Sequence, residues 1–214
     1  MFIAACSDLH SHEIEVPKCD LLICAGDLTL DGNHRQLERF VEWLNEQPAK
    51  HKVFIAGNHD TYLERYPVLV KELLAKTRNI YYLEDKLLAI SELNNLRIYG
   101  SPWTPRYGRW NFMLERGSDE LTRKWSRLPD KLDILVTHGP PAGILDYSPR
   151  GQNVGDEDLG HFVKKTKPRY HIFGHIHYSH GILETEHTTY MNVAICDERL
   201  DPIHEATVFE YEKS

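Results

Sequence analysis

Short apolar runs separated by amphipathic segments characterise the first third of the chain. Residues 2–7 (FIAACS), 21–26 (LLICAG) and 53–57 (VFIAG) are continuously apolar and are bounded by polar residues or glycine. Such runs predict buried β-strands. Residues 34–47 and 67–76 carry apolar side chains at helical spacing, so each predicts an amphipathic helix. This alternation indicates parallel βαβ units.

The remaining pattern adds more strands and one more helix. Asn33 and Gln36 have the spacing of a capping box at the start of the first helix. Further strands are expected at residues 79–85, 87–91, 96–103, 133–139 and 170–177, a helix at about 156–166, and antiparallel strands at 189–194 and 206–212. Parallel units followed by hairpins predict mixed sheets in one layered domain, residues 1–214.

Composition narrows the class of protein. The chain has 214 residues, 41% hydrophobic and 27% charged, which is typical of a globular protein that forms one core. A net charge of −7 argues against a long nucleic-acid partner, which requires a basic surface. The sequence lacks an apolar stretch of the ~20 residues that span a membrane, and "MFIAAC" lacks the basic start of a signal peptide. We therefore expect a cytoplasmic protein, and the oligomeric state is left open.

The four cysteines are Cys6, Cys19, Cys24 and Cys196, and they form no CxxC pair. Cys6 and Cys24 lie inside apolar strand-like runs. We expect all four to be buried, reduced thiols.

Oxygen and nitrogen ligand types follow five of the predicted strands. They are Asp8 and His10 (SDLH), Asp27 (AGD), Asn58, His59 and Asp60 (AGNHD), His138 (VTHG), and His175 and His177 (FGHIH). Ligands of α/β sheets gather at the carboxyl ends of the strands, so these loops should converge on one site. Each motif alone is common, whereas the ordered set indicates a functional site.

This inventory fits two divalent cations. Carboxylate and imidazole without thiolate suit Mn, Fe, Zn, Ni or Co and do not select among them. Of these metals we favour Mn. Two ions ~4 Å apart share a bridging carboxylate and hold a phosphoryl group from both sides. Two aspartates and two divalent ions leave a local charge of about +2, so an acidic protein can bind phosphate here.

The ordered motifs D-x-H, G-D, G-N-H-D, T-H-G and G-H-x-H resemble those of the calcineurin-like metallophosphoesterases. Residues 99–117, 137–146 and 190–210 are similar to the branch of metallophosphoesterase-domain proteins that includes the brain protein 239 type. The resemblance implies an α/β fold (α+β in some schemes): a four-layer αββα sandwich with two mixed sheets and the site on strand-end loops.

The resemblance also implies a role for each matching residue. The first metal ion takes Asp8, His10 and His177, the second takes Asn58, His138 and His175, and Asp27 bridges the two. His59 matches the catalytic histidine that stabilises or protonates the leaving oxygen, and Asp60 is a weaker candidate for a supporting role. Because His175 and His177 belong to different ions, the backbone is expected to turn between them.

The implied activity is hydrolysis of small nucleotide-like phosphodiesters, such as 2',3'- or 3',5'-cyclic nucleotides, by a metal-bridging hydroxide. A phosphomonoesterase, or a nucleotide-binding or scaffold protein with weak catalysis, is the alternative. Protein Ser/Thr phosphatases of the superfamily carry G-D-x-x-D-R-G, whereas residues 26–32 read GDLTLDG without the arginine. This difference counts against a phosphoprotein substrate and leaves open which acid, if any, orients His59.

Substrate contacts are predicted mainly from residues 99–117, which are rich in aromatic and basic side chains. An aromatic ring stacks on a base and an arginine binds phosphate. The candidates are Trp103, Asn111, Arg116, His12 and His180. For His12 and His180 we favour an ordinary polar role. Residues 146–151 could border the cleft, but a plain surface turn is the preferred interpretation.

Overall fold

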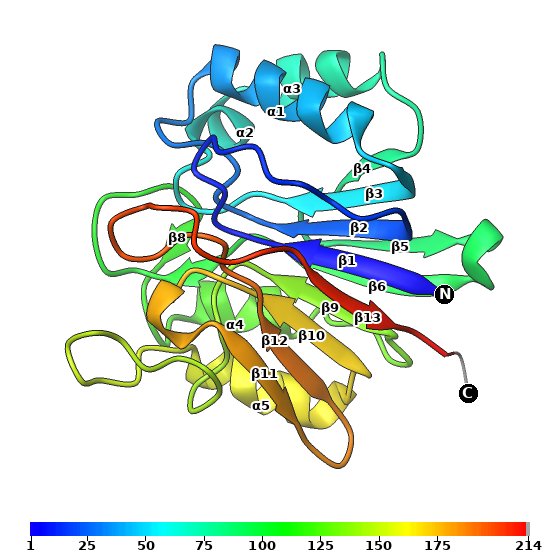
Figure 1. The fold of residues 1–214 in the computed structure, drawn as a ribbon. Helices are drawn as coiled ribbons and strands as arrows, with labels where there is room; N and C mark the ends of the chain where they lie inside the picture. Colours follow the sequence, from blue (N-terminus) through cyan, green and yellow to red (C-terminus); the bar gives the residue numbers. More distant parts are fainter. Residues whose placement is uncertain (213–214) are drawn as a thin grey trace.

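The computed structural model describes residues 1–212 and contains two β-sheets packed face to face (Figure 1). The first sheet has the order β13 (Thr207–Glu210), β1 (Phe2–Cys6), β2 (Cys19–Ala25), β3 (Ala49–Ile55), β4 (Ile80–Tyr82). The second has the order β11 (Gly181–Glu184), β12 (Thr189–Asn192), β10 (Tyr170–Phe173), β9 (Ile134–Thr137), β6 (Leu96–Ser101), β5 (Lys86–Ile90). Only the edge strands β13, β11 and β5 run antiparallel to their neighbours among these named strands, so both sheets are mixed.

Helices cover the outer face of each sheet (Figure 1). The first sheet carries α1 (His34–Glu46), α2 (Thr61–Arg65) and α3 (Pro67–Leu74), and the second carries α4 (Asp119–Trp125) and α5 (Glu157–Thr166). Smaller elements are the 3-10 turns η1 (Ser91–Leu93) and η2 (His177–Ser179) and the pair β7 (Thr104–Pro105) and β8 (Met113–Leu114). The predicted four-layer αββα sandwich, with its α/β class and two mixed sheets, is confirmed.

The continuous apolar runs follow from this layering, because the central strands are buried on both faces. In β1, Ile3 and Ala5 pack between the two sheets, while Ala4 and Cys6 pack against the helices of the first layer. On the other side, Trp125 of α4 joins the cluster that fills the space over the second sheet. Three apolar layers therefore hold the four structural layers together.

The start of α1 matches half of the predicted capping box. The Asn33 side chain accepts a hydrogen bond from the backbone N–H of Gln36 at 3.1 Å, as expected for an N-cap. The Gln36 side chain instead pairs with Asp31, accepting from its backbone N–H at 2.8 Å and donating to its carboxylate at 3.0 Å. The glutamine thus stabilises the preceding turn.

Several element predictions need correction. The segments 189–194 and 206–212 do not pair with each other: β12 forms a hairpin with β11, and β13 joins the edge of the other sheet beside β1. Helices α2 and α4 were not predicted. For α4 the signal was present, because Ser118 caps the helix by accepting a hydrogen bond from the N–H of Leu121.

The four cysteines are buried and free, as predicted. Burial raises the pKa of the Cys24 thiol well above its ordinary value, and the neighbouring Cys6 contributes further. No helix within residues 1–212 is long and apolar enough to cross a membrane.

Candidate metal centre

The predicted ligands come together where the carboxyl ends of five strands meet, on the left in Figure 1. Asp8 and His10 follow β1, Asp27 follows β2, Asn58 follows β3, His138 follows β9, and His175 and His177 follow β10. The chain therefore delivers these side chains from both sheets to one edge of the sandwich.

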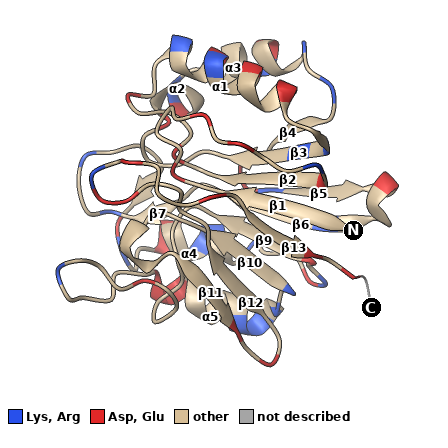
Figure 2. Ribbon diagram, viewed as in Figure 1, with Lys and Arg blue, Asp and Glu red and all other residues tan. Residues whose placement is uncertain are grey.

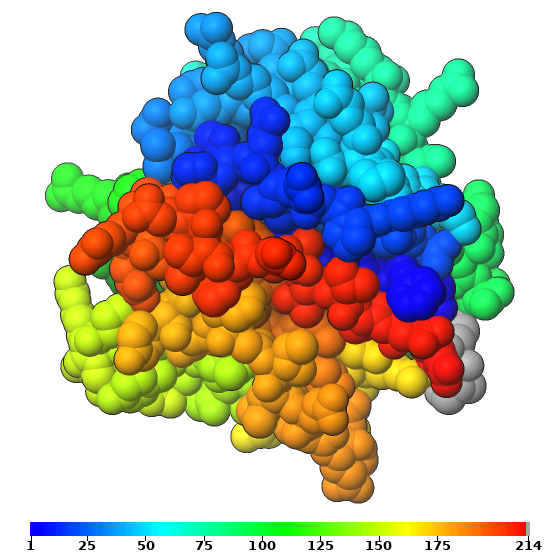
Figure 3. All heavy atoms as spheres, in the orientation of Figure 1, coloured from blue at the N-terminus to red at the C-terminus, as the bar shows by residue number. Residues whose placement is uncertain are grey.

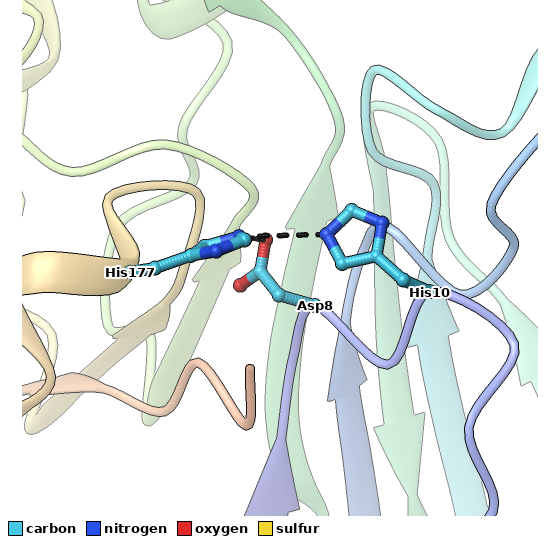
Figure 4. A group of neighbouring side chains, drawn as sticks. All are labelled: Asp8, His10 and His177. Carbon is cyan, nitrogen blue, oxygen red and sulfur yellow. Dashed lines mark hydrogen bonds and ion pairs between the residues drawn. The ribbon is translucent and has the colours of Figure 1, made fainter. Parts of the chain in front are cut away.

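Asp8, His10 and His177 form a first cluster, whose ligand atoms all lie within 4.8 Å of one another. His177 Nε2 is 3.2 Å from Asp8 Oδ1 and 3.4 Å from His10 Nε2. The two imidazoles approach the carboxylate from opposite sides (Figure 4). This set offers two nitrogen donors and one oxygen donor to a single ion.

Asp27 lies between this cluster and a second one that contains His138 and His175. Its Oδ2 is 4.0 Å from His10 Nε2, and its Oδ1 is 3.4 Å from His138 Nε2. The Asn58 side-chain oxygen is 3.0 Å from the same His138 nitrogen. With its oxygens directed at histidines of different clusters, Asp27 has the geometry of a bridging carboxylate.

Backbone carbonyls fix the orientation of two imidazoles. Nδ1 of His138 lies 3.0 Å from the carbonyl oxygen of Ala25, and Nδ1 of His177 lies 2.8 Å from that of Asp197. Each Nδ1–H donates to its carbonyl, which leaves Nε2 directed at the carboxylates. This arrangement, common behind metal-binding histidines, sets the tautomer of the ring.

Four of the predicted ligands have left-handed backbone conformations, which non-glycine residues rarely adopt. The φ angles are 55° for Asp8, 43° for His10, 51° for Asp27 and 69° for His175. At His175 this conformation provides the expected turn, because His175 lies in the second cluster and His177 in the first. Strain concentrated at these positions is typical of functional sites.

Two glycines allow the loops to approach the carboxylates closely. A Cβ atom at Gly174 would overlap with Asp8 Oδ2, and one at Gly57 would overlap with Asp27 Oδ1. The glycines of the FGH and AGN motifs are therefore required by the packing of the ligands themselves.

Charge in the site is balanced between carboxylates and histidines. Burial opposes protonation of His177 and His138, but contact with Asp8 and Asp27 outweighs it and raises the pKa of each histidine to about 9. Burial lowers the pKa of His10 to about 4. Although burial would raise the pKa of Asp8, His177 lowers it to about 2.

The residues fit a pair of divalent cations. Asp8 and Asp27 are 0% and 2% exposed, and the ion-pair partners recorded for these two carboxylates are all histidines. His10 Nδ1 is buried and has no hydrogen-bond partner within residues 1–212, whereas Nε2 of the same ring faces Asp27 and His177. Divalent cations would take over the charge balance and displace the protons from His138 and His177.

His59 lies at the rim of this centre, near His10 and Asp27. Its Nδ1 lies 2.7 Å from the carbonyl oxygen of Leu30, to which it donates, so Nε2 is left for a substrate. A backbone carbonyl, and not an acid, therefore orients the predicted catalytic histidine. The exposed ring of Trp110 stacks on His59 at a centroid distance of 4.5 Å.

Asp60 makes contacts that differ from those expected of a catalytic acid. Its buried carboxylate accepts hydrogen bonds from the backbone N–H groups of Leu28, Thr29 and Gly57 and from the Thr29 hydroxyl. No hydrogen bond to the His59 ring is recorded for this carboxylate in the described chain. Asp60 holds the loop after β2 against the loop after β3, and so acts on the position of Asp27 and His59.

A cleft of about 520 Å³ opens beside His175. Residues 105–107 and Arg116 border it on one side, and residues 148–154 border it on the other. The preferred interpretation of residues 146–151 as a plain surface turn is therefore wrong, since Ser148 and Arg150 line the cleft.

The predicted substrate contacts are mostly engaged elsewhere. Trp103 donates to Asp85 and packs in the core, and the Asn111 side chain donates to the Asn58 carbonyl and to Thr61. Arg116 lines the cleft but is bound to two backbone carbonyls, while His12 and His180 each contact one carbonyl. Tyr107, which lines the cleft, and Trp110, which stacks on His59, were not among the predicted contacts, although both belong to the aromatic segment 99–117.

The sequence profile of the calcineurin-like phosphoesterases matches residues 1–179 of this chain. Metallophosphoesterase domain-containing protein 1 of Homo sapiens and that of Mus musculus are each 36% identical to it, over 95% of this chain and 69% of the relative. A probable glycerophosphodiester phosphodiesterase of Arcobacter nitrofigilis is 25% identical, over 79% of this chain and 60% of that protein.

The crystal structure of the phosphopantetheinyl hydrolase of Mycobacterium tuberculosis has the same fold, with a TM-score of 0.60 at 12% identity over 92% of this chain and 90% of that one. The strand-end motifs, the two buried His/Asp clusters, the profile match and the 36% identical relatives agree. The chain belongs to the calcineurin-like phosphoesterases.

Proposed function

We propose that this protein is a dinuclear metal-dependent phosphodiesterase that hydrolyses small nucleotide-like phosphodiesters, such as 2',3'- or 3',5'-cyclic nucleotides. The observation that carries the proposal is the position of the cleft: about 520 Å³ of space opens at His175, beside the second cluster. A pocket of this size accommodates a nucleotide-sized molecule. A phosphate at the clusters would therefore still leave room for an ester substituent.

The chain would hold the first ion with Asp8, His10 and His177 and the second with Asn58, His138 and His175, joined by Asp27. We favour Mn, which carboxylate and imidazole donors suit. When bound, two divalent cations supply an activated nucleophile at neutral pH and neutralise the phosphoryl oxygens. Charge balance then allows an anionic ester to bind in a protein of net charge −7.

His59 acts on the leaving group. Its Nδ1–H donates to Leu30, so a second proton on this ring, which lies beside His10 and Asp27, is carried by Nε2. From there the proton is donated to the departing oxygen, because an alkoxide is a poor leaving group unless it is protonated. Trp110 stacked on the ring limits its rotation.

A diester is favoured over a monoester by two observations. GDLTLDG lacks the arginine of the phosphoprotein phosphatases, and a relative with 25% identity is described as a probable glycerophosphodiester phosphodiesterase. Neither observation identifies the alcohol part of the substrate, which depends on the shape of the cleft.

The test is a turnover panel with the metal-reconstituted protein. It compares bis-p-nitrophenyl phosphate, p-nitrophenyl phosphate, and 2',3'- and 3',5'-cyclic nucleotides. We expect the diesters to be turned over faster than the monoester, and Mn to support the highest rate. Monoester turnover well above diester turnover would establish a phosphomonoesterase instead. Nucleotide binding without turnover would indicate a binding or scaffold protein.

A further inference from the structure

The loop that borders the cleft opposite residues 105–107 is braced from within. The buried carboxylate of Asp146 accepts hydrogen bonds from the backbone N–H groups of Gly143 and Gly155 and from the side chain of Asn153. At the tip, Ser148 and Gln152 are joined by a backbone hydrogen bond of 2.8 Å. The loop thus carries the architecture of a small hairpin, so the backbone at its tip has a defined position.

Arg116 ties the same loop to the opposite side of the cleft. Its guanidinium donates to the carbonyl oxygens of Gly155 at 2.6 Å and Val154 at 2.7 Å. In Figure 3 the yellow-green segment at the left edge stands away from the surface beside it and leaves an opening. These hydrogen bonds join the two chain segments that line the cleft.

Three arginines line this cleft, and two of them have partners within the protein. Arg106 is paired with Glu115 and donates to the Met113 carbonyl, and Arg116 is bound to the loop. Arg150 is exposed, and no hydrogen bond or ion pair to the described residues is recorded for it. Figure 2 shows basic positions on two loops that project beside the strand ends.

A second polar group of the loop also lacks a partner. Ser148 lines the cleft two residues before Arg150, and its buried hydroxyl oxygen has no hydrogen-bond partner within residues 1–212. Buried polar atoms are normally satisfied by protein, water or ligand. The loop therefore carries an unsatisfied hydroxyl in its interior, and Arg150 is the donor that it exposes to the cleft.

We propose that Arg150 binds a second oxyanion of the substrate, a phosphate or a carboxylate that is separate from the ester hydrolysed at the metal centre. This inference rests on the proposed function for the position of the first phosphate. A guanidinium donates two parallel hydrogen bonds to such a group. The inference narrows the proposed substrate class to phosphodiesters with a further anionic end, which simple cyclic nucleotides lack, and Arg150 determines specificity without taking part in the reaction.

The test measures binding directly, by titration calorimetry on the metal-loaded protein. The probes are alkane-α,ω-diol bisphosphates with three to six carbons, ω-carboxyalkyl phosphates of the same lengths, and the matching alkyl monophosphates. At one chain length we expect the second anion to tighten binding by about fivefold to tenfold. The class of probe that gains more, bisphosphate or carboxyalkyl phosphate, identifies the anion that Arg150 binds.

The variants are Arg150→Ala, Arg150→Lys and, as a control for net charge, Arg123→Ala on the exposed side of α4. Arg150→Ala should abolish the gain from the second anion and leave monophosphate binding unchanged, and Arg150→Lys should restore part of the gain. Arg123→Ala should behave as the wild type. The inference is overturned by equal weakening of mono- and bisphosphates, or by no gain at any length in the wild type.

These outcomes are independent of catalysis. If the metal-loaded protein fails to hydrolyse bis-p-nitrophenyl phosphate, the proposed function fails, but the calorimetric comparison of wild type and Arg150→Ala still decides whether the second oxyanion binds. If hydrolysis proceeds and the comparison shows no difference, only the inference about Arg150 fails.

Discussion

Replacing Asp60 tests how the two central loops are held together. Its carboxylate accepts four hydrogen bonds, from the N–H groups of Leu28 (3.2 Å), Thr29 (3.0 Å) and Gly57 (2.8 Å) and from the Thr29 hydroxyl (2.7 Å). Burial, together with repulsion from Asp27, raises the pKa of Asp60 to about 6, so the carboxylate predominates at neutral pH. Each donor left without an acceptor costs about 1 kcal/mol or more.

Asp60→Asn keeps one acceptor oxygen, and with it two of the four hydrogen bonds, so we expect a loss of about 2 kcal/mol in the free energy of unfolding. Asp60→Ala removes all four and should lose about 4 kcal/mol, a large part of the stability of an ordinary domain. The assay is urea denaturation at pH 7.5 in excess chelator, so that metal binding does not contribute. Asp31→Asn is the matched control, because Asp31 is exposed on the loop after β2 that Asp60 anchors and should change stability by less than about 0.5 kcal/mol.

The same variant should also affect turnover. Asp60 holds the loops that carry Asp27 and His59, and small displacements of reacting groups have large kinetic effects. We expect Asp60→Asn to lower kcat on bis-p-nitrophenyl phosphate by about tenfold or more at saturating metal. An Asn variant with wild-type stability and wild-type kcat would refute the anchoring role.

Three other substitutions follow from single contacts. His171 is buried, and burial lowers its pKa to about 3. Its contribution to the free energy of unfolding is therefore complete above pH 6.5 and is lost as the pH falls from 6.5 towards 3. Between pH 7.5 and pH 5, the wild type should lose about 2 kcal/mol more than His171→Phe in denaturant titrations. Trp110→Ala removes the stack on His59 and should lower kcat by about three- to tenfold for alkoxide leaving groups, with little effect for p-nitrophenolate. Gly174→Ala forces a methyl group against Asp8 and should reduce the metal content measured by mass spectrometry.

A different result would contradict each of these three predictions. A wild-type pH profile of stability that persists in the Phe variant would remove His171 from the account. Equal effects of Trp110→Ala on both leaving groups would point to substrate stacking. For the glycine, the control is Gly160→Ala, where the nearest atom is 3.6 Å from the added Cβ and no strain is expected; full metal content in both variants would contradict the close-packing explanation.

The layers and the ligand positions could be predicted from the sequence because both depend on local patterns. Continuous apolar runs indicate strands that are buried on two faces. A polar ligand residue directly after such a run lies at the carboxyl end of the strand, where the ligands of α/β sheets gather. Asp8 and Asp27, for example, are the first carboxylates after β1 and β2. The local pattern of apolar and polar residues was therefore sufficient to predict the layered fold and the ligands of the metal centre.

The borders of the cleft depend on contacts between distant segments, which no local pattern records. Arg116 is fixed by carbonyls at residues 154 and 155, and Asn111 by the carbonyl of Asn58. Their residue types suit substrate binding equally well, so only the folded structure reveals that these donors are already engaged. The same holds for His59, whose orienting group is a backbone carbonyl and therefore has no side-chain signature.

In the proposed centre, seven side chains hold two metal ions that support diester hydrolysis. The decisive experiment measures metal content by mass spectrometry and turnover of bis-p-nitrophenyl phosphate on the same preparations of wild type and Asp27→Asn. We expect two ions per chain in the active wild type, and loss of both the full metal content and the turnover in Asp27→Asn, because Asp27 faces histidines of both clusters. Undiminished turnover with one ion or none per chain would contradict it.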